Sequence, residues 1–305
     1  MPVVDGQQLP VVSILIANFN GGALFAECID SLKRNPQQTP FEVIVIDDAS
    51  SDDSSQQAQA AMPAVTLLRN DRNLGLTRSL NRGIASSRGR YMLVLDNDTT
   101  VLTGALDHLV EYLDGNPDVG VAVSRLYNPD MSLQRTARRF PHPLNGLFGR
   151  RSWLTKVFPN NRFVQNYMLA ELENSSEPYD IDWGSTAAMM VRKQAIDQAG
   201  GLDEEFFVYW CDADWCHRIK RHGWRVSCVP GSGVIHNENL KAGHRKGSRS
   251  RMIRDFHRGA WLYFRKNQLR HRYGPMGMAT LGALSARAGI LIVMDKLRLA
   301  LASGK

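Results

Sequence analysis

Hydrophobic residues in the first part of the chain form short runs that alternate with segments of helical periodicity. The runs are rich in valine and isoleucine and predict β-strands, whereas apolar residues spaced three or four apart predict helices. The predicted strands are Val11–Ala17, Phe41–Asp47, Val65–Arg69 and Tyr91–Leu95, and the predicted helices are Leu24–Lys33, Ser54–Ala61 and Leu76–Ser87. This alternation is typical of an α/β fold in which helices flank a mostly parallel sheet.

The pattern weakens in the second part of the chain and then returns. Residues Tyr127–Tyr179 are rich in proline, asparagine, arginine and aromatic residues, and they predict an irregular insertion. The regular segments around it are a helix at Gly104–Asn116, a strand at Val119–Arg125, order from Ile181 to Val191, helices at Lys193–Ala199 and Asp212–His222, and a strand at Trp224–Val229. We therefore predict a main domain over residues 1–240, divided into 11–125 and 126–240.

The C-terminal residues 241–305 differ from this body in charge. The net charge of the chain is +7, but Lys241–Pro275 contains eleven lysines and arginines against the single Asp255, so the body is acidic and the tail basic. Apolar residues from Met252 to Phe264 recur at helical spacing, which predicts a basic amphipathic helix. The apolar run Met276–Met294 contains Arg287, which favours an interfacial or oligomer-packing helix over a transmembrane one.

Composition indicates a globular protein of a reducing compartment. Apolar residues make up 43% of the chain and charged residues 22%, and the first residues lack the basic and apolar pattern of a secretory signal. Cys211, Cys216, His217 and Cys228 do not have the spacing of common zinc modules, and buried thiols are the better interpretation. We expect a cytoplasmic protein.

Two acidic clusters follow predicted strands. Asp47–Asp48 comes after the second strand and Asp96–Asn97–Asp98 after the fourth, so both lie at the edge of the sheet where ligands of open α/β folds bind. Carboxylates at this density repel one another unless a cation or hydrogen-bond donors stabilise them. An Asp-x-Asp pair is suited to Mg²⁺ or Mn²⁺ that also binds diphosphate oxygens. Taken alone, the motif is equally compatible with a solvated turn.

The order of several motifs resembles family 2 glycosyltransferases with the GT-A fold. The segments that carry this resemblance are Val12–Asn20, Val43–Asp52, Asn73–Gly83, Leu95–Thr99, Gly200–Tyr209, Asp212–Arg218 and Val234–His236. Together they span about four fifths of the chain. The glycine, phenylalanine and arginine pattern is similar to that of bacterial rhamnosyltransferases of cell-surface polysaccharide assembly.

The resemblance implies a donor site and a metal site. Asp48 is expected to accept a hydrogen bond from the N3–H of uracil or thymine, and the main chain at Ala17 and Asn18 is expected to line the base. Asp96 would bracket the ribose and the metal, and Asp98 and His236 would be metal ligands, although a lone histidine is as often structural. The further donor-site candidates are Asn73, Arg78 and Asn97; for Arg78 a solvated helix face is the alternative.

The resemblance also places a catalytic acid–base residue at the start of a late helix. Asp212 is expected to be the general base of an inverting reaction, and Cys211 stands where the family usually has glutamate. Asp214 is an acceptor-side candidate, with a helix-dipole role as the stronger alternative. Trp183 and Gly184 are further acceptor-side candidates, with a core tryptophan as the alternative.

The implied function is transfer of a sugar, with rhamnose one candidate, from a UDP- or dTDP-sugar to a hydroxyl of a glycan or polyprenyl-linked acceptor. The basic tail suggests peripheral contact with the inner face of the cell membrane, and a homodimer is conceivable; nucleic acid is not an expected partner. The alternatives are a nucleotidyltransferase and a non-catalytic binding module. A nucleotidyltransferase would be expected to have a glycine-rich basic loop after the first strand, and Asn18–Gly22 contains no lysine or arginine. Retention of the acidic motifs argues against a non-catalytic binding module.

Overall fold

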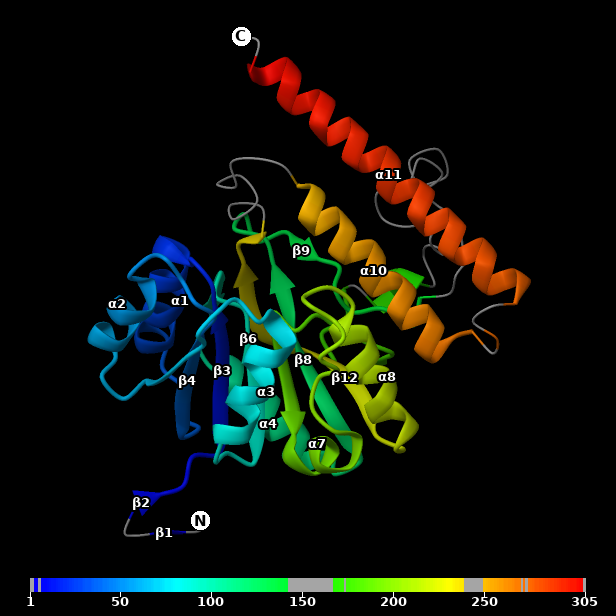
Figure 1. The fold of residues 1–305 in the computed structure, drawn as a ribbon. Coiled ribbons are helices and arrows are strands. Elements are labelled where there is room, and N and C mark those ends of the chain that lie inside the picture. The colour runs from blue at the N-terminus through cyan, green and yellow to red at the C-terminus, as the bar shows by residue number, and fades with distance from the viewer. Residues whose placement is uncertain are drawn as a thin grey trace.

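A mixed β-sheet forms the centre of the molecule (Figure 1). The structure is a computed structural model that describes residues 3–4, 7–141, 167–172, 174–238, 249–269, 271 and 274–303. The strand order is β10 (Tyr179–Ile181), β12 (Arg225–His236), β8 (Val119–Tyr127), β11 (Ala188–Arg192), β6 (Tyr91–Leu95), β3 (Val12–Asn18), β4 (Phe41–Asp47) and β5 (Thr66–Arg69). In addition, β7 (Thr99–Val101) pairs with β12 and β9 (Leu133–Gln134) pairs with β8, while β1 (Val3–Val4) and β2 (Gln7–Gln8) form a separate ribbon.

The first half of the sheet follows the sequence prediction closely. The strands β6, β3, β4 and β5 are all parallel, and their bounds lie within one residue of the predicted ones. The second half is mixed, because β11 runs antiparallel to both of its neighbours, β6 and β8. The regular segment predicted from Ile181 to Val191 corresponds to two strands, β10 and β11, which pair with different neighbours.

Strand β12 is longer than predicted, and the extension positions the site described below. The sequence predicts a strand that ends at Val229, because Pro230 and Gly231 usually mark a turn. In the structure these residues form an irregularity within one strand, and pairing with β8 resumes at Gly233. The strand therefore continues to His236, and the last residues of the strand also pair with β7.

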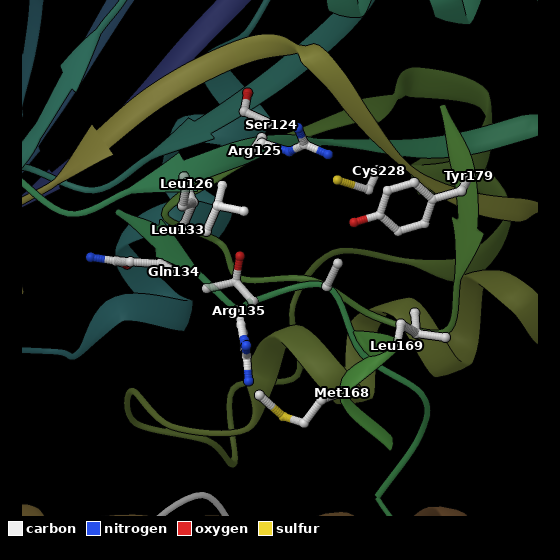
Figure 2. Close-up of a pocket in the computed structure, with 12 residues that line it drawn as sticks. Ser124, Arg125, Leu126, Leu133, Gln134, Arg135, Met168, Leu169, Tyr179 and Cys228 are labelled. Atoms are coloured by element: carbon white, nitrogen blue, oxygen red, sulfur yellow. The ribbon is translucent and has the colours of Figure 1, made fainter. Parts of the chain in front are cut away.

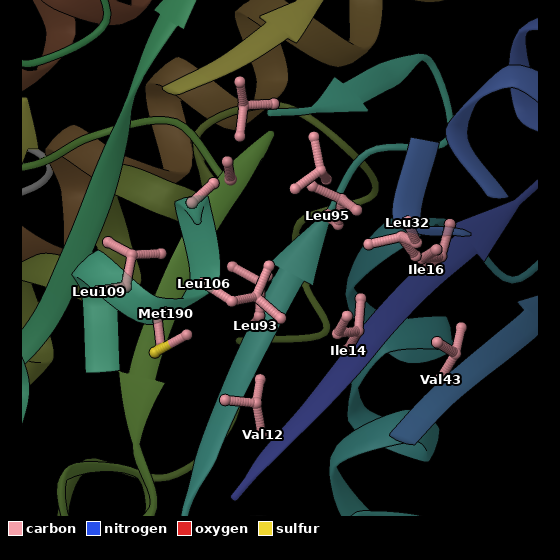
Figure 3. Packing of buried hydrophobic residues seen from close by; sticks show 14 of the residues in the cluster. Val12, Ile14, Ile16, Leu32, Val43, Leu93, Leu95, Leu106, Leu109 and Met190 are labelled. Atoms are coloured by element: carbon pink, nitrogen blue, oxygen red, sulfur yellow. The ribbon is translucent and has the colours of Figure 1, made fainter. Parts of the chain in front are cut away.

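Helices cover both faces of the sheet. The helices α1 (Gly22–Arg34), α2 (Ser54–Ala61) and α4 (Ala105–Gly115) contribute to one hydrophobic cluster, and α3 (Leu76–Ser86), α7 (Lys193–Ala199), α8 (Cys211–Arg221) and α10 (Ser250–Asn267) contribute to the other. Alternation along β3 explains the two cores, because Ile14 and Ile16 pack into the first cluster and Leu15 into the second. Figure 3 shows the first cluster.

The predicted basic tail begins with a helix that belongs to the second core. Residues Ala260, Leu262, Tyr263 and Phe264 of α10 are buried there. Helix α11 (Pro275–Ser303) packs along α10 and extends beyond it (Figure 1). The division into a main domain, 1–240, and a tail, 241–305, stays a prediction. Residues 142–166 of the predicted insertion and the basic residues at 241–248 lie outside the described residues.

The packing of α10 predicts opposite effects for two glycine substitutions in the tail. A Cβ atom at Gly259 would lie 2.6 Å from the carbonyl oxygen of Tyr209, whereas one at Gly282 of α11 would have no neighbour within 4 Å. We expect Gly259→Ala to lower the free energy of unfolding by about 1–3 kcal/mol through overpacking. Gly282→Ala should leave it unchanged or raise it by up to about 1 kcal/mol through helix propensity. Urea denaturation measures both, and equal effects would show that α10 does not pack on the body.

Candidate active site

Three side chains from distant parts of the chain meet at the ends of β6 and β12. Asp96 and Asp98 lie in the turn between β6 and β7, and His236 is the last residue of β12. The antiparallel register places His236 opposite Thr99, and the backbone N–H of Asn237 donates to the carbonyl oxygen of Asp98 at 2.8 Å. Backbone pairing therefore brings the histidine to the acidic turn.

The side-chain geometry of this cluster is suitable for a divalent cation. His236 Nε2 lies 3.7 Å from Asp96 Oδ2 and 3.6 Å from Asp98 Oδ1, and the three ligand atoms lie within 4.8 Å of one another. Asp98 and His236 are buried, and Asp96 is partly exposed. Carboxylate oxygens and an imidazole nitrogen suit Mn²⁺, and oxygen ligands suit Mg²⁺. The structure thus brings together Asp98 and His236, the two expected ligands, and adds Asp96 as a third.

The histidine of this cluster has a shifted pKa. Burial acts to lower the pKa of His236, but hydrogen bonding to Asp98 and the charges of Asp96 and Asp98 outweigh burial and raise it. The second ring nitrogen, Nδ1, lies 3.0 Å from Oε1 of Gln134, a buried residue of β9. Sequence analysis missed Gln134, because a single glutamine in an aperiodic segment, 102 positions away, carries no signal.

The loop after β3 is joined to the acidic turn by buried amides. Asn18 donates from Nδ2 to the hydroxyls of Ser54 and Ser55 at the start of α2, at 2.9 and 2.8 Å. Its Oδ1 accepts from Nδ2 of Asn97 at 2.7 Å. The side chains of Asn18 and Asn97, two expected donor-site residues, therefore hold the strand ends together, and the contact of the main chain with the base stays a prediction.

Asp48 is held by three donors at the end of β4. Its Oδ1 accepts from Nδ2 of Asn70 and from the backbone N–H of Leu74, each at 2.7 Å, and its Oδ2 accepts from the N–H of Gly75 at 2.9 Å. Two carboxylate oxygens offer about four acceptor positions. Within the described residues these donors fill three positions, and the expected bond from the N–H of a pyrimidine base would use a fourth.

The other expected donor-site residues lie around this loop. Ala17 is half-buried and packs against the second core cluster. Asn73 is half-buried, and its Oδ1 has no hydrogen-bond partner within the described part of the chain. Arg78 is exposed on α3, with Nε 3.3 Å from Oε2 of Glu204. This ion pair corresponds to the alternative of a solvated helix face.

The expected general base lies at the N-terminal end of α8. Asp212 is partly exposed, and its Oδ1 accepts from the N–H of Ala213 at 2.8 Å. Burial raises the pKa of the Asp212 carboxyl from 3.8 to about 6, and the charge of Asp96 adds to this shift. The preceding Trp210 adopts a left-handed backbone conformation with φ 74°, which is rare for a bulky residue. The structure thus combines a perturbed carboxyl with local strain, as functional sites often do.

The expected acceptor-side residues are engaged in packing. Asp214 is buried and accepts from Arg218 Nε and from Asn267 Nδ2 of α10, both at 2.8 Å. The indole N–H of Trp183 donates to the carbonyl oxygen of Arg139 at 2.9 Å, and the ring lies in the second core cluster. A Cβ atom at Gly184 would lie 2.9 Å from the side chain of Val123. These contacts correspond to the structural alternatives, and the acceptor-side roles stay predictions.

A small open pocket of about 30 Å³ adjoins the site through Gln134 (Figure 2). It is lined by residues of β8, β9, β10 and β12, and none of Asp96, Asp98 and Asp212 is among them. Its lining combines apolar side chains with two arginines and a tyrosine: Ser124, Arg125, Leu126, Leu133, Gln134, Arg135, Thr136, Ala137, Met168, Leu169, Tyr179 and Cys228.

Comparison with known proteins identifies the family and the fold. The sequence profile described as glycosyl transferase family 2 matches residues 13–200. The chain is 26% identical to an N-acetylglucosaminyl-diphospho-decaprenol L-rhamnosyltransferase of Mycobacterium tuberculosis, over 93% of this chain and 92% of the relative.

Two solved structures share the fold. One is a mannosyltransferase from Pyrobaculum calidifontis in complex with GDP-mannose and Mn²⁺, with a TM-score of 0.55, 18% identity, and coverage of 97% of this chain and 76% of that chain. The other is GalNAc-T7 with UDP, GalNAc and Mn²⁺, with a TM-score of 0.56, 16% identity, and coverage of 76% and 44%.

The cluster of Asp96, Asp98 and His236 predicts stabilisation by a divalent cation. Binding to the native state alone adds about 2.7 kcal/mol at a concentration one hundred times the dissociation constant. We expect Mn²⁺ to raise the midpoint of thermal unfolding of the wild type, and to have no such effect on Asp98→Asn. Asp197→Asn, which removes one exposed carboxylate from α7, is the matched control and should keep the shift. An equal shift in all three proteins would place the bound metal elsewhere.

Proposed function

This chain belongs to glycosyl transferase family 2, and from that premise we propose that it is an inverting enzyme that moves a sugar from a UDP- or dTDP-sugar to a hydroxyl of a cell-surface glycan precursor. The observation that carries the proposal is the meeting of Asp96, Asp98 and His236 at the strand ends. Family membership favours sugar transfer over the alternatives of a nucleotidyltransferase and a binding module.

The donor would bind across the ends of β3, β4 and β6. Asp48 would accept from the pyrimidine N3–H, and discrimination would follow because a base without that donor leaves a buried acceptor without its partner. Asp96, Asp98 and His236 would hold Mg²⁺ or Mn²⁺; the two carboxylates suit either ion, and the imidazole suits Mn²⁺. A bound cation supplies positive charge against the diphosphate leaving group.

Asp212 would act as the general base. The acceptor oxygen attacks the anomeric carbon from the face opposite the diphosphate, the bond to the diphosphate breaks, and the acceptor proton passes to the Asp212 carboxylate. A pKa raised to about 6 suits a base that must be ionised at neutral pH and still accept a proton readily. Cys211 is buried, with Sγ directed to the carbonyl oxygen of Val208, so it is not a second base.

The name of the mycobacterial relative supports a particular substrate pair. That relative is named for a rhamnose donor and a decaprenyl diphosphate acceptor that carries N-acetylglucosamine. By similarity, we propose rhamnose as the transferred sugar and a polyprenyl-linked sugar as the acceptor.

An acceptor of this kind would require contact with the cytoplasmic face of the membrane, and α11 is suited to that contact. The segment Pro275–Leu301 is long and apolar enough to cross a membrane, with a mean hydropathy of 1.6. However, it is tied to α10: Asp295 accepts from the backbone N–H of Arg249 at 2.7 Å, and Arg287 contacts His257 at 3.1 Å. Since α10 belongs to the core, α11 would lie on the membrane surface and not cross it.

Replacement of the base predicts loss of turnover without loss of binding. We expect Asp212→Asn to lower kcat by about 10²–10⁴-fold while the affinity for the nucleotide stays within a factor of two or so. Because the raised pKa means that the ionised carboxyl disfavours the folded state above pH 6, the variant should be at least as stable as the wild type at pH 8. Asp197→Asn is again the matched control and should be fully active.

The same assignment predicts the pH profile, because only the ionised carboxylate accepts a proton. In the wild type, kcat/KM should fall below about pH 6 by about tenfold per pH unit. Steady-state kinetics between pH 5 and 8 measures the profile. Full turnover by Asp212→Asn, or a flat wild-type profile, would contradict the role of Asp212.

Membrane contact through α11 predicts flotation with liposomes that contain anionic lipid. Ile290, Val293, Met294, Leu297 and Leu301 are between 56% and 76% exposed, and their spacing of i, i+3, i+4, i+7 and i+11 places them on one face of the helix. Val293→Asp/Leu297→Asp should abolish flotation, and the matched Val293→Ile/Leu297→Ile should retain it. Equal flotation of the two variants would exclude this helix as the contact.

A further inference from the structure

Gln134 makes two hydrogen bonds to one residue of the acidic cluster. Its Oε1 lies 3.0 Å from Nδ1 of His236, and its Nε2 donates to the carbonyl oxygen of the same residue at 2.8 Å. The side chain is 8% exposed. In Figure 2 it extends from β9 away from the centre of the pocket that it lines.

The orientation of the Gln134 amide follows from its partners. The carbonyl oxygen of His236 can only accept, so the atom of Gln134 that faces it must be the nitrogen. The same nitrogen also lies 2.9 Å from Oδ1 of Asn128. The amide oxygen is therefore the atom that faces the imidazole ring.

Asn128 is itself held by hydrogen bonds within the turn between β8 and β9. Asn128 donates from Nδ2 to Oγ of Ser132 at 2.8 Å, and Ser132 donates to Oδ1 of Asp130 at 2.5 Å. In this series of hydrogen bonds each residue donates to the next, from Gln134 to Asn128, then to Ser132, and finally to the carboxylate of Asp130, which can only accept. This network orients Asn128, whereas the carbonyl oxygen of His236 sets the orientation of the Gln134 amide directly and does not depend on Ser132.

An amide oxygen can only accept a hydrogen bond, and this determines which nitrogen of the His236 ring carries the proton. Nδ1 of His236 must carry a hydrogen to donate to Gln134, so in the neutral ring Nε2 has its lone pair free. Nε2 is the atom that faces Asp96 and Asp98 at 3.7 and 3.6 Å. The nitrogen with the lone pair is the one that points into the cluster of carboxylates.

We propose that Gln134 is a positioning residue, which selects the Nδ1–H tautomer of His236 and aims Nε2 at the cation held with Asp96 and Asp98. The inference rests on the proposed metal site of this enzyme. Gln134 does not touch the cation or the substrates; it acts through the histidine. Partners of this kind commonly change metal affinity by about 10–100-fold.

The first measurement concerns the wild type without metal. With ¹⁵N-labelled histidine, long-range proton–nitrogen correlation spectra distinguish the two neutral tautomers. At a pH at which the His236 ring is neutral, the Nδ1–H tautomer should predominate. Predominance of the Nε2–H tautomer would overturn the proposal, whatever the metal does.

The second measurement compares Mn²⁺ affinity in Gln134→Met and Ser132→Ala by calorimetry. Methionine keeps the length of the side chain and removes both hydrogen bonds to His236, so the dissociation constant should rise by about 10–100-fold and the Nε2–H tautomer should increase. Ser132→Ala is the matched control, because it perturbs the same turn and leaves both Gln134–His236 contacts in place. It should bind Mn²⁺ within a factor of about two of the wild type.

The outcomes separate this inference from the proposed function. Tight Mn²⁺ binding by the wild type and equally tight binding by Gln134→Met would overturn the role of Gln134 and leave the metal site standing. Equal weakening in both variants would also overturn it, because the effect would then belong to the turn. If the wild type binds no Mn²⁺ even with UDP or dTDP, the metal site itself fails, and the tautomer measurement still decides whether Gln134 orients His236.

Discussion

The pairing of β7 with β12 is the constraint on which the site depends. Because the register sets His236 opposite Thr99, this last residue of β12, in the second half of the sheet, lies beside the acidic turn that follows β6, in the first half. Asp96 and Asp98 repel each other, and this repulsion would separate them if the backbone were free. Backbone hydrogen bonds of the sheet, together with the contact of Asn97 with Asn18, hold the turn in a geometry that a cation stabilises. The free energy of folding thus offsets the electrostatic repulsion between the two carboxylates.

Helix α10 packs against both the start of α8, which bears Asp212, and the apolar helix α11. Its Phe256, Tyr263 and Phe264 surround the ring of Trp210, with centroids 5.5 to 5.7 Å away. Trp210 keeps its left-handed conformation two residues before Asp212, so aromatic packing from the tail supports the strained start of α8. Helix α11 also packs on α10, where Arg287 contacts His257. If the acceptor is lipid-linked, as we propose, the helix proposed to contact the membrane and the proposed general base would both be attached to α10.

Sequence periodicity was sufficient for the first half of the fold and insufficient for the second. The strands β3, β4 and β6 are largely buried and continuous, and helices separate them along the chain, so their pattern is unambiguous. The length of β12 could not be predicted, because a Pro-Gly-Ser run has the same sequence signature whether it ends a strand or forms a bulge within one. The meeting of Asp98 and His236 followed from the order of motifs. The role of Gln134 did not, because it depends on a register between residues far apart, and the packing of Trp183 depends on side chains that periodicity does not identify.

Calorimetric titration of UDP and of dTDP into the protein, with and without Mn²⁺, tests the central claim most directly. The account predicts that one of the two nucleotides binds in the presence of Mn²⁺, that binding is weak or absent without the ion, and that Asp98→Asn loses the metal-dependent part. The preferred nucleotide would then identify the class of donor. Absence of binding by both nucleotides under every condition, in a protein that unfolds cooperatively, would contradict the assignment of a donor site at the ends of β3, β4 and β6.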